Sequence, residues 1–323
     1  MAREPLTRAE FLKILMAGAG GIVFLRGSED ALAALAGADD DLDQAALDGD
    51  LGRGGVPYLT VVHGTPVAAN VKTAIAKLGG MRRFVSAGDD VVIKPNICAP
   101  RAPKYAVTTN PVVVATLVRL ARGAGAKRVR VMDYPISSSA SSCYSKSGIA
   151  SAVKAAGGSM KIMSAGTGWA TYAIPGGPLG RQSLYKAIVG CDVLINVPIA
   201  KQHGSTGLTL AGKNMMGCTR DRGRMHTLGL SRTIAELNAK LKPDLTVLDA
   251  IRILIRHGPT GGDLADVRRK DIVIAGRDWV AVDAYATRLF GKKPGFVPYI
   301  AAAAKMGLGK ADLTGLAIRK YEV

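Results

Sequence analysis

The chain has 323 residues, of which 48% are hydrophobic and 21% are charged, and its formal net charge is +18. This length and hydrophobic content exclude an intrinsically disordered chain and suffice for a large buried core, built either as one domain or as two lobes that share a sheet. The excess of Lys and Arg favours a negatively charged partner, whereas aromatic residues make up only 5% of the chain, which disfavours a surface for stacking nucleic-acid bases.

Residues 1–36 are predicted to be an export signal. Two arginines precede a largely apolar run, 14–25, and small residues after it offer a cleavage site. Residues 7–13 resemble the twin-arginine export motif, with Ala9 in the place of the second arginine, so both that route and general secretion stay open. The apolar run is short for a membrane span. We therefore expect an exported, periplasmic or otherwise extracytoplasmic protein that contacts the membrane only through this signal, cleaved or retained as an anchor.

An acidic linker is predicted at 37–56. It contains six aspartates separated by small residues and has little apolar surface, which is typical of a flexible spacer. The folded domain is therefore expected to cover residues 57–323.

In this domain, segments with strand patterns alternate with segments of helical periodicity. Strands are predicted at 58–63, 91–94, 128–133, near 160, and at 192–197, 245–248 and 272–275. Helices are predicted at 67–78, 111–124, 149–156, 181–189, 233–241, 280–289 and 297–306. Such alternation predicts an α/β fold with a mostly parallel sheet and helices on both of its faces.

In a parallel sheet, every loop that follows a strand emerges at the same edge, where ligands bind in open α/β folds. Lys94 ends the second predicted strand, with Asn96 and Cys98 just after it, and Asp133 ends the third. The loop after the strand at 192–197 is the richest, because it interleaves glycines with basic and imidazole side chains. Its polar or reactive members are Lys201, His203, Lys213, Asn214, Cys218, Arg220, Arg222, Arg224 and His226. We predict a functional site at this edge instead of a solvated basic loop.

Four of these residues are candidates for chemistry: His203, Lys213, Asp133 and Lys94. An imidazole titrates near neutral pH, so His203 suits a general acid or base, or a ligand. Lys213 follows a glycine and has apolar neighbours that can lower its pKa, which suits a covalent or direct charge role. The alternatives are structural: a lysine that binds loop carbonyls and a histidine that holds its turn.

The remaining polar residues favour an anionic ligand. Glycines let backbone N–H groups approach an anion, while Lys and Arg supply charge and donors that match carboxylate or phosphate. The predicted substrate-binding residues are Asn96, Lys201, Asn214, Arg220, Arg222 and Arg224.

The four cysteines are not in paired CxxC spacing, so neither a zinc ribbon nor a haem attachment is predicted. Cys191 precedes its strand and is expected to be a small buried hydrophobe. Cys98, Cys143 and Cys218 follow strands. A disulfide between Cys98 and Cys218 is one hypothesis for an exported protein. The other is a soft-metal site that includes Cys98 and Cys218 and is completed by His226 or His203.

Several segments together resemble the domain of unknown function 362 (DUF362) family. They are Val92-Ile93-Lys94-Pro95-Asn96, Thr109-Asn110-Pro111, Gly125-Ala126-Lys127, the loop 201–217 and Val280-Ala281-Val282-Asp283. The likeness covers most of residues 58–291. Some members carry ferredoxin-type cysteine runs, but this chain has no such run, so an iron–sulfur cluster of that type is not expected.

A more distant resemblance is to the lactate racemase superfamily. It implies an α/β scaffold, a transition metal or a lysine-tethered cofactor, and isomerase or redox chemistry. His203, Gly207, Lys213 and His226 follow that family's order of histidine, glycine turn, cofactor lysine and metal-binding histidine. The order breaks at Asp133, where the racemases have a second catalytic histidine, so their paired-histidine racemization is not implied.

Three classes of function are consistent with these patterns. The favoured one is an exported enzyme that binds a small carboxylate or phosphate at the strand ends. The second is a protein that binds an anion, metal or cofactor without catalysis. The third, binding of a polyanion such as nucleic acid or lipid, ranks lowest because no known nucleic-acid-binding motif is present.

Overall fold

The computed structural model describes residues 55–137 and 139–323. The predicted export signal, 1–36, and nearly all of the predicted linker, 37–56, lie outside the described residues. Within the described part, no helix is long and apolar enough to cross a bilayer.

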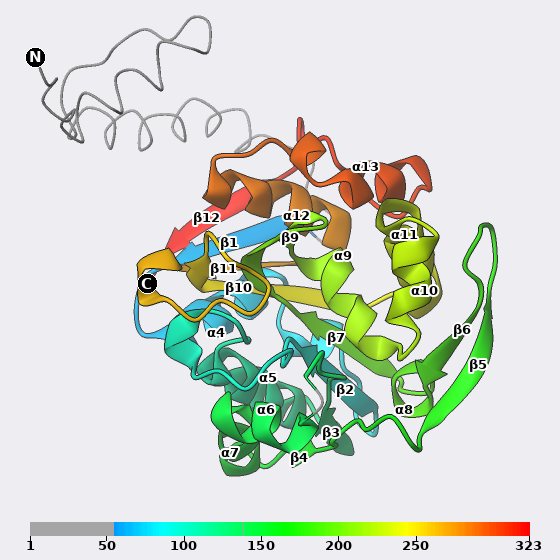
Figure 1. Cartoon of the computed structure of the whole chain (residues 1–323). Helices are drawn as coiled ribbons and strands as arrows, with labels where there is room; N and C mark the ends of the chain where they lie inside the picture. Colours follow the sequence, from blue (N-terminus) through cyan, green and yellow to red (C-terminus); the bar gives the residue numbers. More distant parts are fainter. Residues whose placement is uncertain (1–54, 138) are drawn as a thin grey trace, which may run out of the picture. The chain divides into compact units, whose positions relative to one another are not determined.

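A ten-stranded mixed sheet forms the centre of the described fold (Figure 1). Eight strands follow the order β12-β1-β11-β10-β7-β2-β3-β4, and β8 and β9 extend the sheet beside β10. The strands are β1 (Leu59–His63), β2 (Asp90–Pro95), β3 (Arg128–Val131), β4 (Ser159–Met160), β7 (Val193–Val197), β8 (Ile199–His203), β9 (Gly207–Thr209), β10 (Leu245–Leu254), β11 (Val267–Gly276) and β12 (Ile318–Glu322).

Most neighbouring strands are parallel. Strand β2 pairs in parallel with both β3 and β7, and β7 pairs in parallel with β10. Strand β11 is antiparallel to β1 and β10, and β9 is antiparallel to β8. The prediction of a mostly parallel α/β sheet is confirmed.

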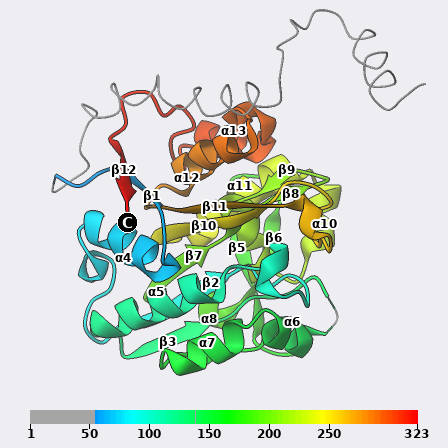
Figure 2. The ribbon, with the colours of Figure 1, turned by 90° about the vertical axis from the view of Figure 1, so that its left-hand side faces the viewer.

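Helices cover both faces of the sheet, which explains why β7 is buried along its whole length and has four apolar residues out of five. Figure 2 shows α4, α5 and α7 below the sheet and α12 and α13 above it. One core cluster joins α4, α5 and α7 to the sheet, and the other joins α11, α12 and α13 to its opposite face. The helices are α4 (Val67–Lys77), α5 (Pro111–Gly123), α6 (Ala140–Lys146), α7 (Ile149–Ala155), α8 (Lys186–Val189), α9 (Ala211–Asn214), α10 (Arg222–Thr227), α11 (Leu230–Leu241), α12 (Trp279–Ala286) and α13 (Pro298–Lys305).

Several segments differ from the sequence prediction, and two of them bear on the site. Residues 181–189 were expected to form a helix, but β6 (Gly180–Tyr185) pairs with β5 (Trp169–Ile174) as a hairpin, and only α8 is helical. Cross-strand pairing with a segment that the sequence left unassigned thus overrides the local pattern. The stretch after β7, expected to be a loop, begins with β8, which pairs with β10 and places Lys201 and His203 on a strand.

Candidate functional site

A pocket of about 110 Å³ lies where β2, β3 and β7 end. Its walls come from the end of β2, the residues after β3, strand β8, and the stretch from α9 through η3 (Met215–Cys218) to α10. Ten of the thirteen predicted site residues line it; Arg220, Arg224 and Cys218 do not. The lining residues are Lys94, Asn96, Cys98, Asp133, Tyr134, Ile136, Lys201, His203, Thr209, Lys213, Asn214, Met216, Gly217, Arg222, His226 and Pro259.

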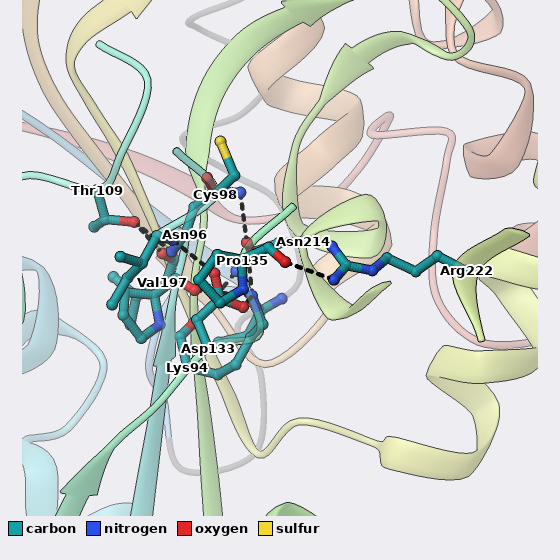
Figure 3. Close-up of polar contacts among 12 residues, drawn as sticks. Lys94, Asn96, Cys98, Thr109, Asp133, Pro135, Val197, Asn214 and Arg222 are labelled. Atoms are coloured by element: carbon teal, nitrogen blue, oxygen red, sulfur yellow. Dashed lines mark hydrogen bonds and ion pairs between the residues drawn. The ribbon is translucent and has the colours of Figure 1, made fainter. Parts of the chain in front are cut away.

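Lys94 and Asp133 form a buried ion pair at the floor of this pocket (Figure 3). Lys94 Nζ lies 2.7 Å from Asp133 Oδ1, and the two side chains are 1% and 3% exposed. Lys94 Nζ also donates to the carbonyl of Pro95 at 2.8 Å, and Asp133 Oδ2 accepts from the Ile97 N–H at 2.6 Å. The two charges neutralise each other, so the pair ties the ends of β2 and β3 together. A direct catalytic role for Lys94 and Asp133 stays a prediction.

Three asparagines extend this floor. Asn214 Oδ1 accepts from Lys94 Nζ at 3.0 Å and from Asn96 Nδ2 at 2.9 Å. Asn214 Nδ2 donates to Asn196 Oδ1 at 2.8 Å, and Asn196 Nδ2 donates to the carbonyl of Ala211 at 3.0 Å. The chain of amides fixes α9 against the ends of β2 and β7.

Lys201 is buried and its ammonium is fully surrounded by protein acceptors. Lys201 Nζ donates to Asn96 Oδ1 at 3.1 Å and to the carbonyls of Val107 at 2.7 Å and Pro259 at 3.1 Å. It also lies 3.0 Å from Cys98 Sγ. Lys201 therefore adds positive charge to the pocket but has no donor to spare for a ligand.

Gly217 lets the chain pass directly over the ion pair. A Cβ atom at this position would lie 2.0 Å from Asp133 Oδ1 and 2.7 Å from Lys94 Nζ. Only glycine fits there, which gives a physical reason for the glycine that ends the loop 201–217.

Helix α9 holds Lys213 in place. Asp283 accepts from the N–H groups of Ala211 and Gly212 at 2.6 and 2.9 Å, at the start of this one-turn helix. Gly212 packs so closely on Trp279 that a Cβ would lie 2.5 Å from the ring. Burial raises the pKa of Asp283 to about 8. The sequence singled out Asp283 only through its family motif, and the structure gives it this capping contact.

The Lys213 ammonium has no oxygen partner within residues 55–137 and 139–323. Its one polar contact there is the thioether of Met216, 3.3 Å from Nζ, although the residue is only 8% exposed. Burial and then the positive charges of Lys201 and Arg222 lower the pKa of Lys213 to about 8. Within the described residues, Lys213 Nζ makes no hydrogen bond to a loop carbonyl.

Two histidines face the same ammonium from β8 and α10. His203 Nδ1 accepts from the Ser205 N–H at 3.1 Å, so the proton of the neutral ring lies on Nε2. Burial and then the charges of Lys213 and Lys201 lower the pKa of His203 to about 3. Burial and then Lys213 also lower the pKa of His226, whose exposed ring makes no hydrogen bond within the described residues. Both imidazoles are thus neutral at neutral pH.

Arg222 lines the pocket and packs on a pair of aromatic rings, a contact that the sequence did not predict. Its guanidinium lies 4.5 Å from the centroid of the Tyr134 ring, which contacts Trp169 edge to face at 5.1 Å. Arg222 Nη2 donates to the carbonyl of Pro135 at 2.7 Å. Its other nitrogens have no acceptor in the described part of the chain.

Arg220 and Arg224 are not in the pocket, contrary to the sequence prediction. Arg220 donates to the carbonyl of Ala165, and Arg224 donates to carbonyls of the β5–β6 region, including Arg181. Residues that alternate along the short helix α10 and the turn before it cannot all face one side, so only Arg222 points inward.

The predicted disulfide and metal site are not formed by the described residues. All four cysteines are free, and Cys218 is fully buried outside the pocket. No three His, Cys, Asp or Glu side chains in the described ranges gather closely enough to hold a metal ion. The donor set of Cys98, Cys218 and His226 therefore does not fit a metal held by protein side chains.

The model of the domain of unknown function DUF362 matches residues 91–288. The chain belongs to the DUF362 family. This confirms the resemblance seen in the sequence, and the match includes every residue that lines the pocket, from Lys94 to Pro259. A thylakoid-associated protein of Synechocystis sp. (strain ATCC 27184 / PCC 6803 / Kazusa) is 29% identical over 258 residues, which are 76% of this DUF362 chain and 77% of that protein.

Two solved structures are similar to parts of this chain. The lactate racemase apoprotein of Thermoanaerobacterium thermosaccharolyticum matches with a TM-score of 0.42 at 10% identity, over 69% of this chain and 55% of that one. A Thermotoga maritima protein solved by a structural genomics consortium matches with a TM-score of 0.38 at 11% identity, over 75% and 60% of the two chains. This DUF362 chain thus spans less than two thirds of either structure.

Proposed function

We propose that the pocket binds a small carboxylate or phosphate and that the protein is an enzyme that acts on it. The observation that carries the proposal is the buried Lys213 ammonium, whose one polar partner in the described part of the chain is the thioether of Met216. A buried charge without a counterion is costly, and an anion supplied by a ligand would offset that cost.

The hydrogen-bond pattern of the pocket residues supports the binding of an anion. At the floor of the pocket, the ammonium groups of Lys94 and Lys201 already have protein oxygens as partners, so they do not need a ligand. As far as the described residues go, no protein oxygen accepts from Lys213 Nζ, the ring of His226, His203 Nε2, or Nε and Nη1 of Arg222. These donors carry positive charge or N–H groups, and a carboxylate or phosphate offers the matching acceptors.

Catalysis is favoured over simple binding by the protonation states. A group transfers protons efficiently when its pKa lies near the working pH, and the pKa of Lys213 is lowered to about 8. The neutral imidazole of His226, which makes no hydrogen bond within the described residues, lies in the same pocket as the Lys213 ammonium. The alternative, a binding protein without turnover, would use the same donors. Only an activity assay can distinguish it from an enzyme.

The location we propose is outside the cytoplasm or at a membrane. The pattern of residues 1–36 supports export, and the relative from Synechocystis is named as thylakoid-associated. Fractionation of the native host, with antibodies against residues 57–323, would place the protein, and recovery in the cytoplasmic fraction alone would refute export.

Calorimetric titration with lactate, oxalate and inorganic phosphate tests the proposed site. The variant Lys213→Met removes the central charge, and Lys72→Met removes an equal charge from the exposed surface of α4 as a matched control. We expect the wild type and Lys72→Met to bind alike and Lys213→Met to lose at least tenfold in affinity. Equal affinity in all three proteins would refute the site. Turnover of each bound ligand is then followed by NMR, and binding without turnover would select the non-catalytic alternative.

A further inference from the structure

We propose that the ligand is a 2-oxo acid and that the Lys213 amine forms an imine with its carbonyl carbon. This inference rests on the proposed anion site and adds the identity of the reacting group. Of the three lysines in the pocket, Lys94 and Lys201 are bound to protein oxygens, and only the Nζ of Lys213 is open to a ligand.

The surroundings of Lys213 produce a reactive amine. Burial and two neighbouring cations lower its pKa to about 8, so about one molecule in ten has the neutral amine at pH 7, against about one in 3,000 for an ordinary lysine. Desolvation next to other cations is an established way to activate a lysine toward carbonyl compounds.

Arg222 supplies a place for the carboxylate of the same ligand. Its guanidinium is held by the Pro135 carbonyl and the Tyr134 ring, which leaves its other nitrogens to pair with a carboxylate. The charge of Arg222 acts on Lys213, so the two groups are neighbours in the pocket. In a 2-oxo acid the carbonyl carbon is bonded directly to the carboxylate carbon, so a carboxylate on Arg222 brings the carbonyl toward Lys213.

The histidines can carry the protons of this step. The amine nitrogen bonds to the carbonyl carbon, and the electrons of the C=O π bond move to the oxygen, which His203 Nε2–H can stabilise by a hydrogen bond. His226 takes one proton from the nitrogen and delivers it to the oxygen, which gives a carbinolamine. The second proton of the amine follows by the same route, the C=N bond forms, the C–O bond breaks, and the oxygen leaves as water. One amine and one ketone give one imine and one water, so no oxidant or reductant is needed.

Reductive trapping tests the inference. The protein is incubated with pyruvate and sodium cyanoborohydride, and the adduct is located by intact mass and peptide mapping. We expect one adduct per chain, on Lys213, in the wild type and in Lys72→Met, and none on this peptide in Lys213→Arg. The trapping rate should rise about tenfold per pH unit up to about pH 8 and then level off, as the amine is deprotonated.

Lactate separates the imine from the anion site, because it has the carboxylate but no carbonyl. Lactate should protect Lys213 from trapping, and Lys213→Arg should still bind lactate because the positive charge remains. Binding of lactate and pyruvate with no adduct, or with adducts spread evenly over surface lysines, would overturn the imine and leave the anion site standing. Failure of both acids to bind would overturn both proposals.

Discussion

Replacing Lys213 by methionine should stabilise the protein while it abolishes ligand binding. On folding, the pKa of Lys213 falls from the ordinary 10.5 to about 8. The folded state therefore disfavours the charged ammonium relative to the unfolded state. This difference corresponds to about 3 kcal/mol of folding free energy at neutral pH. Methionine has a similar length and no charge, so Lys213→Met should raise the free energy of unfolding at pH 7 by about 2–3 kcal/mol.

The stability advantage of Lys213→Met over the wild type should decrease as the pH rises. Between the folded pKa of about 8 and the unfolded value of 10.5, the unfolded wild type binds more protons than the folded one. The stability of the wild type therefore rises with pH across this window, and its full penalty applies below pH 8. The advantage of Lys213→Met should shrink by about 2 kcal/mol between pH 7 and pH 9.5 and vanish near pH 10.5.

Urea unfolding of the wild type, Lys213→Met and Lys72→Met at several pH values measures these differences. Lys72→Met controls for the loss of one charge at the surface. A Lys213→Met protein that is less stable than the wild type at pH 7 would show that the ammonium stabilises the fold. That result would refute the argument that Lys213 is kept for a ligand.

Three further outcomes follow from the pocket. Lys94→Met leaves the buried Asp133 without its counterion, so the free energy of unfolding should fall by about 3–5 kcal/mol in urea; a loss under 1 kcal/mol would deny that the pair holds the strand ends together. Gly217→Ala places a Cβ 2.0 Å from Asp133 Oδ1, so lactate affinity should drop in calorimetry, and unchanged affinity would contradict the tight floor. Lactate affinity of the wild type should fall as pH rises through about 8, where Lys213 loses its charge, whereas a flat profile would exclude that charge from binding.

The position of the site could be predicted from the sequence because it depends on the direction of the strands. Lys94, Asp133 and Lys213 are far apart along the chain, yet parallel strands bring the residues after them to one edge of the sheet. Strands β2 and β7 are buried along nearly their whole length, so their apolar residues form runs that are visible in the sequence.

The local geometry could not be predicted, because it depends on partners from elsewhere in the fold. The spacing of Arg220, Arg222 and Arg224 does not reveal that only the middle one faces the pocket. The sequence also could not show how the two ammonium groups differ. In the described structure, Lys201 donates to several oxygens, whereas the one polar partner of Lys213 is a thioether. The helix expected at 181–189 was wrong for the same reason, because β5 pairs with β6.

The most direct test of the account is an NMR titration of the Lys213 side chain, with and without lactate, assigned by comparison with Lys213→Arg. The account predicts a pKa of about 8 for the free protein and a higher pKa when lactate is bound, because an anion favours the ammonium. An ordinary lysine pKa that does not change with lactate would contradict it.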